Sequence, residues 1–227
     1  LRLVGSEMCI RDRYNIMLVL SSYGLPMAVS KLVSARFTKK RYKSAAKVLR
    51  CSLMVAVCTG GIAALLVFFG ASFIENVIYG GGLPGLAVPL RILAPTIFLV
   101  AILGVIRGFF QGQSTMIPTA VSQILEQIVN AIVSIAAGYG MMKAFASSPD
   151  VAAYGAAGST LGTAMGALTA VLFMGFLYAV YTPTFNRLKR KDRHTENQST
   201  GQICKIIIYT TVSYTHLRAH ETELHLV

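Results

Sequence analysis

The sequence predicts an all-α membrane protein that crosses the bilayer several times, and three observations indicate this fold class. First, hydrophobic residues make up 54% of the chain and charged residues 13%, whereas soluble domains carry roughly 25% charged residues. Second, several apolar runs approach the ~20 residues that a helix needs to cross a bilayer. Third, the strands of alternating polarity that are typical of transmembrane barrels are absent from the sequence. A bundle of spanning helices is the arrangement that remains.

The two ends of the chain are expected to lie outside this fold. One codon spelling of Arg2 to Asp12 has a reverse complement that translates as Val212 to Thr222 of the same chain. Unrelated coding segments do not do this by chance, and the spelling resembles a transposon-end adapter used in sequencing libraries. Residues 1–13 and 212–227 are therefore interpreted as adapter-derived. The biological sequence is expected at residues 14–211, as an internal piece of a longer protein.

Five membrane segments are predicted within the biological sequence, at residues 14–32, 51–69, 90–110, 118–142 and 154–181. In the first segment, Gly24-Leu25-Pro26 is expected to break or bend the helix, because proline removes a backbone hydrogen bond. Pro95 predicts a similar disturbance in the third segment. Residues 203–209 resemble the start of a further segment.

The fourth and fifth segments carry more specific signals. Pro118 opens the fourth segment, where its missing backbone N–H costs little because the first helical turn has no partner for that group. In the fifth segment, Gly158, Gly162 and Gly166 recur every four residues. They predict a smooth stripe against which a neighbouring helix can pack closely.

The basic residues gather on one side of the predicted membrane. The loops of the opposite side hold only Arg91 and Lys143. Because loops rich in Lys and Arg stay in the cytoplasm, the first segment is predicted to run from outside to inside, and the fifth to end inside. The basic residues of the predicted cytoplasmic side are Lys31, Arg36, Lys39, Lys40, Arg41, Lys43, Lys47, Arg50, Arg107, Arg187, Lys189, Arg190, Lys191, Arg193 and Lys205.

This distribution explains the net charge of +12 without any nucleic-acid partner. Lys43, Lys47 and Arg50 fall on one helical face and predict a short interfacial helix before the second segment. Such a helix gains about 1 kcal/mol per Lys or Arg near anionic lipid. Residues 187–200 are predicted to form a solvated cytoplasmic loop.

Residues that carry catalytic or metal chemistry are few. His194 is the single histidine of the biological sequence, and Cys51, Cys58 and Cys204 are expected to fill apolar space. The sequence shows no nucleophile–base pair, no cluster with metal-ligand spacing and no glycine loop for phosphate. It therefore predicts no enzyme, no cofactor and no metal site.

The fourth segment is unusual because polar residues repeat along it. Gln123, Glu126, Gln127, Asn130 and Ser134 lie at helical offsets of three, four, seven and eleven, which puts them on one face. A carboxylate facing lipid costs about 2.5–3.5 kcal/mol even on insertion scales, so this face must meet protein or water. Two interpretations stay open: a polar contact that joins helices, and the lining of a watery cavity.

Arg107 is the predicted partner of Glu126. It lies about one turn before the end of the third segment, while Glu126 lies about two turns into the fourth. The connecting turn at residues 111–117 is short, so the two helices are expected to be antiparallel neighbours. An arginine side chain is long enough to bridge the remaining offset.

Three stretches of the sequence resemble one family of membrane proteins. "RGFFQGQSTMIPTAVSQILEQIVN" (residues 107–130) is similar to the signature of polysaccharide-biosynthesis and stage V sporulation protein B-type proteins. "YNIMLVLSSYGLPMAVSKLVSARF" (14–37) resembles their second membrane helix, and "LRILAPTIFLVAILGVIRG" (90–108) their fourth. The resemblance implies the multidrug/oligosaccharidyl-lipid/polysaccharide exporter superfamily, whose fold has about fourteen helices in two pseudo-symmetric lobes. This chain would supply helices two to six.

The resemblance also implies a function, the flipping of an undecaprenyl-linked cell-wall or polysaccharide precursor across the cytoplasmic membrane. The expected partners are membrane lipid, the lipid-linked oligosaccharide pyrophosphate and a coupling ion. Cations suit the pyrophosphate, and amides suit sugar hydroxyls. The candidate substrate-binding residues are Lys31, Arg107, Gln123, Glu126, Gln127 and Asn130.

Alternatives accompany this interpretation. Family members often carry a basic residue where this chain has Asn130, which weakens a direct phosphate contact at that position. Lys31 has a second interpretation as an ordinary interfacial anchor, and Glu126 as the organiser of Arg107 or an ion sensor. Two other functions stay open: a cation- or proton-coupled drug exporter of the same superfamily, and a membrane scaffold without transport for envelope or spore assembly.

Overall fold

The computed structural model describes residues 24–73, 87–146, 151–192 and 199–211, and these residues are almost entirely helical. The ends interpreted as adapter, and the beginning of the first predicted segment, lie outside the described residues. The described helices are residues 24–38, α2 (Tyr42–Phe73), α3 (Ala87–Gln111), α4 (Ile117–Ala144), α5 (Val151–Lys191) and residues 200–211.

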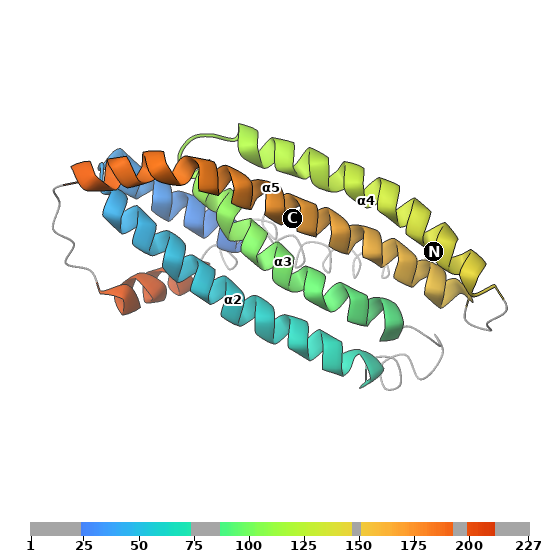
Figure 1. Ribbon diagram of the computed structural model, residues 1–227. Helices are drawn as coiled ribbons and strands as arrows, with labels where there is room; N and C mark the ends of the chain where they lie inside the picture. Colours follow the sequence, from blue (N-terminus) through green and yellow to red (C-terminus); the bar gives the residue numbers. More distant parts are fainter. Residues whose placement is uncertain (1–23, 74–86, 147–150, 193–198, 212–227) are drawn as a thin grey trace, which may run out of the picture.

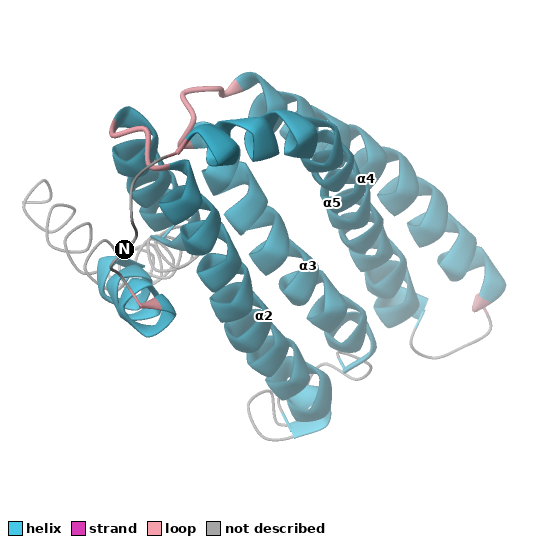
Figure 2. Ribbon diagram, turned by 60° about the vertical axis from the view of Figure 1, so that its left-hand side comes forward, coloured by secondary structure: helices cyan, strands magenta, loops and turns pink. Residues whose placement is uncertain are grey.

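The long helices lie side by side as a bundle (Figure 1). Across it they follow the order α2, α3, α5, α4 (Figure 2), because α3 packs against both α2 and α5, whereas α4 packs mainly against α5 and touches α3 much less. Consecutive long helices run in opposite directions. The N-terminus of α2, the C-terminus of α3, the N-terminus of α4 and the C-terminus of α5 therefore share one end of the bundle, which we call the basic end.

All four long helices are long and apolar enough to cross a membrane. They confirm the second to fifth predicted segments. The first predicted segment is described only from Gly24 onward, where it is helical to residue 38. Residues 200–211 form a helix where the start of a further segment was predicted. The fold is thus the predicted all-α, multi-spanning one.

Two boundaries differ from the sequence-based prediction. No separate interfacial helix precedes the second span, since Lys43, Lys47 and Arg50 form the first turns of α2 itself. Residues on the opposite side of these turns, such as Val48, are buried in the core. Their packing stabilises helical structure in the basic segment, so α2 begins before the apolar run. The predicted loop at residues 187–200 is also wrong at its start, because α5 continues to Lys191.

Pro95 does not break its helix, although a break was one of the two disturbances that the sequence predicted there. Helix α3 runs unbroken through Pro95, and α5 runs unbroken through Pro183. Pro118 lies in the first turn of α4, as predicted. Phe185, two residues after Pro183, is 1% exposed, so this part of α5 is held in the core of the bundle.

An aromatic cluster closes the basic end of the bundle. Phe109 lies at its centre and makes edge-on contacts with Phe37 and Phe185, with ring centroids 6.3 and 5.5 Å apart. Such pairs add about 0.5–1.5 kcal/mol each beyond the area that they bury. The cluster therefore ties the helix at residues 24–38 to α3 and α5 at this end. Its rings are Phe37, Tyr42, Phe109, Phe110, Tyr178, Tyr181 and Phe185.

The predicted glycine stripe of α5 lies directly against the backbone of α4. A Cβ atom on Gly158 would stand 2.5 Å from the carbonyl oxygen of Ala137, and one on Gly166 would stand 2.7 Å from that of Glu126. A Cβ atom on Gly162 would overlap the hydroxyl of Ser134. Only glycine permits this approach, which confirms the packing role expected for the stripe.

The basic residues are sorted between the ends of the bundle as the sequence predicted. A hydrogen bond joins two parts of the basic end, because the backbone N–H of Lys43 in α2 donates to Oδ2 of Asp192 after α5, over 2.9 Å. Arg91 lies in the first turns of α3 and Lys143 in the last turn of α4. Both of these are at the opposite end, where α2 and α4 end and α3 and α5 begin.

Candidate functional site

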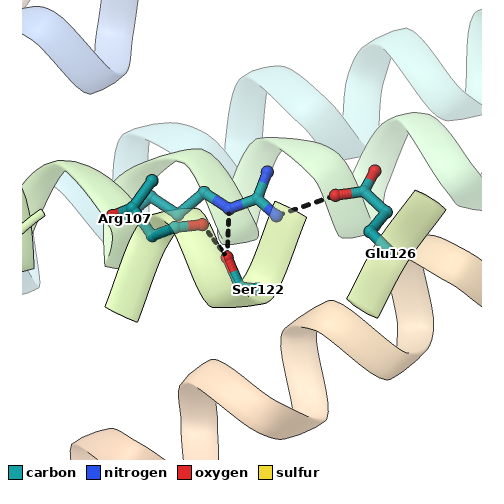
Figure 3. Close-up of polar contacts among 4 residues, drawn as sticks. Arg107, Ser122 and Glu126 are labelled. Atoms are coloured by element: carbon teal, nitrogen blue, oxygen red, sulfur yellow. Dashed lines mark hydrogen bonds and ion pairs between the residues drawn. The ribbon is translucent and has the colours of Figure 1, made fainter. Parts of the chain in front are cut away.

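A polar contact joins the last turns of α3 to the first turns of α4 (Figure 3). Nη2 of Arg107 lies 2.7 Å from Oε2 of Glu126, and the two side chains are 15% and 20% exposed. Nε of Arg107 donates to the hydroxyl of Ser122 over 2.9 Å, and that hydroxyl donates to the carbonyl oxygen of Thr119 over 2.8 Å. Arg107 and Glu126 therefore form the predicted ion pair, and Ser122 orients the guanidinium.

Short connections bring these side chains together. Helix α3 ends at Gln111 and α4 begins at Ile117, so the chain reverses within a few residues. Ser114 has a φ of 61° in this turn, in the left-handed region that few residues other than glycine adopt. The reversal places the last turns of α3 beside the first turns of α4, and the side chain of Arg107 spans the gap.

Partial burial makes this pair costly to disrupt. An ion pair taken out of water loses hydration, so the removal of one partner from a buried pair typically costs about 3–5 kcal/mol. Arg107 and Glu126 retain some exposure, and the pair thus combines a strong mutual attraction with partial access. Such a pair can hold the helices together and can also present a charge to a bound headgroup.

A hollow of about 560 Å³ lies one helical turn away from Arg107. It is bordered by Gln111, which follows Arg107 by four residues in α3, and by Lys31 of the helix at residues 24–38. Its volume falls in the range of roughly 300–1,000 Å³ that small-molecule sites occupy. We call it the Lys31 hollow, and its lining residues are Met27, Ser30, Lys31, Ser34, Ala35 and Gln111.

Two glycines set the position of this hollow. A Cβ atom on Gly108 would lie 2.6 Å from the carbonyl oxygen of Pro26, and one on Gly112 would lie 2.7 Å from that of Ser30. The end of α3 is therefore pressed against the helix at residues 24–38. This contact brings Gln111 and Lys31 to the same hollow, four residues along α3 from Arg107.

Lys31 was predicted from the sequence, whereas the other polar residues of the hollow, Ser30, Ser34 and Gln111, were not. Ser30 and Ser34 are four residues apart on either side of Lys31, a spacing that was readable as a polar face. The contact with Gln111 required knowledge of which helices are neighbours. The hollow thus combines one ammonium group, two hydroxyls and one amide.

The remaining polar residues of α4 do not share a single environment. Asn130 and Ser134 face α5, where the hydroxyl of Ser134 lies 3.0 Å from Oδ1 of Asn130 and 2.9 Å from the carbonyl oxygen of Ser159. A hydroxyl donates one hydrogen, so it serves these two acceptors in turn. Of the two interpretations of the polar face of α4, the polar contact that joins helices is therefore the one that applies around Asn130.

Gln123 and Gln127 are exposed instead. Ala120, Gln123, Gln127 and Ala131 lie at successive offsets of three or four residues. They form a narrow exposed stripe of small and amide side chains, which we call the amide stripe. A second exposed stripe on α4 is composed of large apolar residues, namely Val121, Ile124, Ile128, Ile132, Ile135 and Tyr139. Because the apolar stripe suits lipid, the amide stripe is the one available to a polar surface or cavity.

The sequence matches one protein family over most of its length. This family is described as polysaccharide biosynthesis protein, and the match covers residues 8–215. It includes the Arg107–Glu126 pair, the Lys31 hollow and all the long helices.

Three proteins of Bacillus subtilis (strain 168) are similar to the chain. Lipid II flippase MurJ is 34% identical over 140 residues, which cover 59% of this chain and 26% of that protein. Stage V sporulation protein B is 28% identical over 214 residues, covering 92% of this chain and 39% of its own length. The membrane protein YabM is 28% identical over 198 residues, covering 86% and 34% respectively. The chain thus spans 26% to 39% of the length of these relatives.

A solved structure shows the same fold. It is the inward-facing conformation of a multidrug resistance MATE family transporter of the MOP superfamily, and it superposes on the chain with a TM-score of 0.64. The sequences are 14% identical, and the match covers 91% of this chain and 45% of the transporter. With its four apolar spans and these relatives, the chain is a multi-pass bacterial cytoplasmic membrane protein, and it belongs to the polysaccharide biosynthesis protein family.

Proposed function

We propose that the full-length protein flips an undecaprenyl-linked cell-wall or polysaccharide precursor across the cytoplasmic membrane, with no bond made or broken. The observation that supports this most strongly is the Lys31 hollow beside the Arg107–Glu126 pair. A lipid-linked saccharide carries a pyrophosphate next to its sugars, so its carrier must offer cations and neutral hydrogen-bonding groups close together. The hollow and the pair offer both over successive turns of α3.

Each group has a distinct role in this proposal. The ammonium of Lys31 attracts the pyrophosphate, since a charge-assisted hydrogen bond is roughly twice as strong as a neutral one. Ser30, Ser34 and Gln111 bind sugar hydroxyls or phosphate oxygens. Arg107 adds positive charge one turn deeper, and Glu126 holds its guanidinium in place and keeps the site from binding anions too tightly for release.

The exposed amide stripe of α4 extends the proposed polar path. Gln123 and Gln127 have donors and acceptors for sugar hydroxyls without a net charge. Asn130 is assigned a supporting role, because its Oδ1 lies within hydrogen-bond reach of Ser134 at the interface with α5. A coupling ion supplies the driving force in this proposal.

Two other functions compete with the flippase. A cation- or proton-coupled drug exporter is favoured by the similarity in fold to a multidrug resistance transporter, and it requires an acidic group for a cationic substrate. Glu126 is engaged by Arg107, so its carboxylate is less available to a cationic substrate, whereas the ammonium of Lys31 suits an anionic headgroup. A scaffold without transport has no need for a hollow lined by Lys31 and hydroxyl groups.

Complementation of a flippase-depleted bacterial strain tests this proposal. The full-length gene should restore growth. The variant Lys31→Gln should restore it poorly, because its flipping rate should fall about tenfold when a charge-assisted hydrogen bond of about 1.5–3 kcal/mol is lost. Lys39→Gln is the matched control, since Lys39 is exposed and lies outside the hollow. Equal activity of the two variants at equal membrane levels would contradict the role of Lys31.

A further inference from the structure

One face of α2 changes along its length from charged to apolar. The residues of this face succeed each other at offsets of three or four, so they form a continuous stripe. Its first two turns are basic, and the turns that follow are apolar. We call it the α2 stripe, and in chain order it consists of Lys43, Lys47, Arg50, Met54, Val57, Gly61, Leu65 and Phe68.

Most of the α2 stripe lies open along the described part of the bundle, and Lys47 is half-buried. Met54 is 51% exposed, Val57 44% and Leu65 58%. Open space surrounds the position where Gly61 would carry a Cβ atom. Arg50 is likewise exposed at the boundary between the two halves of the stripe. A cation therefore lies at one end of an accessible apolar track.

Helix α5 adds positive charge beside this boundary. Lys189 of α5 lies close enough to Arg50 for the two positive charges to repel each other. The Nζ atom of Lys189 lies 5.2 Å from the ring centroid of Phe185. Asp192 is the one acidic residue near this boundary among the described residues, and it can neutralise no more than one of these cations. The boundary thus has an excess of positive charge contributed by two helices.

We propose that the α2 stripe binds one anionic phospholipid of the cytoplasmic leaflet. Its phosphate lies against Arg50 and Lys47, and one acyl chain follows Met54, Val57 and Leu65. Arg50 can hold two phosphate oxygens at once through its planar guanidinium. The order of charge and apolar surface along α2 matches the order of headgroup and tail in a lipid, and it does not match an acidic peptide, which has no long tail.

This site is separate from the proposed transport path. The Lys31 hollow is formed by the helix at residues 24–38 and the end of α3, and none of its residues belongs to the α2 stripe. The lipid site is therefore independent of whether the protein flips a saccharide precursor, and the two proposals can fail separately.

Lipid binding to the full-length protein tests the inference. Phosphatidylglycerol and phosphatidylcholine are titrated onto purified protein, and bound lipid is counted by native mass spectrometry. Lys47→Gln/Arg50→Gln should weaken phosphatidylglycerol binding about thirtyfold, given the attraction of about 1 kcal/mol that each cation near a membrane surface contributes. The matched control, Lys39→Gln/Arg187→Gln, removes the same two charges from other exposed positions of the basic end and should change binding less than about twofold.

A photo-crosslinking residue in place of Met54 provides a readout that leaves both cations intact. It should label phosphatidylglycerol in preference to phosphatidylcholine. Equal weakening by both double variants would show that only the total charge matters, and this would overturn the site. Equal affinity for the two lipids would overturn it as well. Crosslinks from position 54 to another segment of the protein, or to a second copy, would show that protein covers the stripe and would also contradict the proposal.

Discussion

Arg107 and Glu126 show how two charged residues are accommodated within membrane-spanning helices. Their side-chain atoms meet at 2.7 Å with limited exposure, and Ser122 fixes the direction of the guanidinium. An isolated charge within a membrane-spanning helix would be expensive, whereas the pair presents a dipole of fixed orientation. The pair therefore stabilises the α3–α4 junction and remains partly exposed.

The variant Glu126→Gln should impair transport more than it impairs membrane insertion. The amide keeps the size of the carboxylate, but Arg107 loses its counter-charge in a partly dry site, which is costly. Arg107→Gln should also reduce activity, and the double variant should lose less than the sum of the two if the residues act as a unit. Transport rate and membrane level, measured together, check this.

The control for this cycle is Leu125→Ala, which changes packing on a different face of α4. It should lower stability without altering substrate preference. Normal transport by Glu126→Gln at normal membrane levels would remove the functional role of the pair and leave it as a contact between helices.

Single residues also show how far the sequence could predict the site. The Arg107–Glu126 pair was predictable, because the short turn between α3 and α4 makes them antiparallel neighbours. The distances of the two residues from this turn along their helices then bring Glu126 within reach of the Arg107 side chain. The division of the polar face of α4 was not. Asn130 meets α5 while Glu126 meets α3, and this depends on the angle at which α4 crosses its neighbours.

At the level of elements, apolar runs predicted the spans but not their ends. Helix α2 begins at Tyr42 and α5 ends at Lys191, beyond the apolar runs in both cases. Burial of Val48 and Phe185 extends the two helices into basic sequence. Hydropathy reports the membrane-embedded part of a helix, whereas tertiary packing decides where the helix stops.

The glycine stripe of α5 gives a prediction about helix packing. Gly162→Ala should destabilise the protein by roughly 1–3 kcal/mol, the usual cost of overpacking a tight contact, because its Cβ atom would overlap Ser134. Thermal unfolding of the purified full-length protein measures the loss. Gly175→Ala is the control on the same helix, where open space surrounds the added atom. It should be neutral, or stabilising by up to about 1 kcal/mol.

A loss of stability in Gly175→Ala equal to that in Gly162→Ala would contradict this prediction. Such a result would mean that any added side chain on α5 is harmful, whichever face carries it. The close approach of α4 would then no longer explain the stripe.

At the level of the whole molecule, the distribution of basic residues predicts its orientation. In full-length protein that lacks native cysteines, Lys40→Cys and Lys189→Cys should be protected from an impermeant thiol reagent added outside the cell. Gly82→Cys, on the opposite side of the predicted membrane, should react. Both lysines belong to the basic end of the bundle, which is placed in the cytoplasm because loops rich in Lys and Arg stay there. Labelling of Lys40→Cys from outside would reverse the orientation.

The chain represents 26% to 39% of the length of its relatives. The proposed activity therefore belongs to the full-length protein. The fold was predictable from hydropathy and the family resemblance, and the superposition at a TM-score of 0.64 agrees with it. The Lys31 hollow was only partly predictable, because it forms where the helix at residues 24–38 meets α3. A sequence read one segment at a time does not show such a junction.

The central claim is that the protein carries a lipid through recognition of its pyrophosphate–saccharide headgroup. The most direct test is a flipping assay on the full-length protein in proteoliposomes that contain either a fluorescent undecaprenyl-pyrophosphate saccharide or undecaprenol alone. We predict that the protein accelerates flipping of the pyrophosphate saccharide and has little effect on undecaprenol. The variant Lys31→Gln should flip the saccharide at no more than about a tenth of the wild-type rate. Equal rates for the two lipids, or no acceleration of either, would contradict the claim.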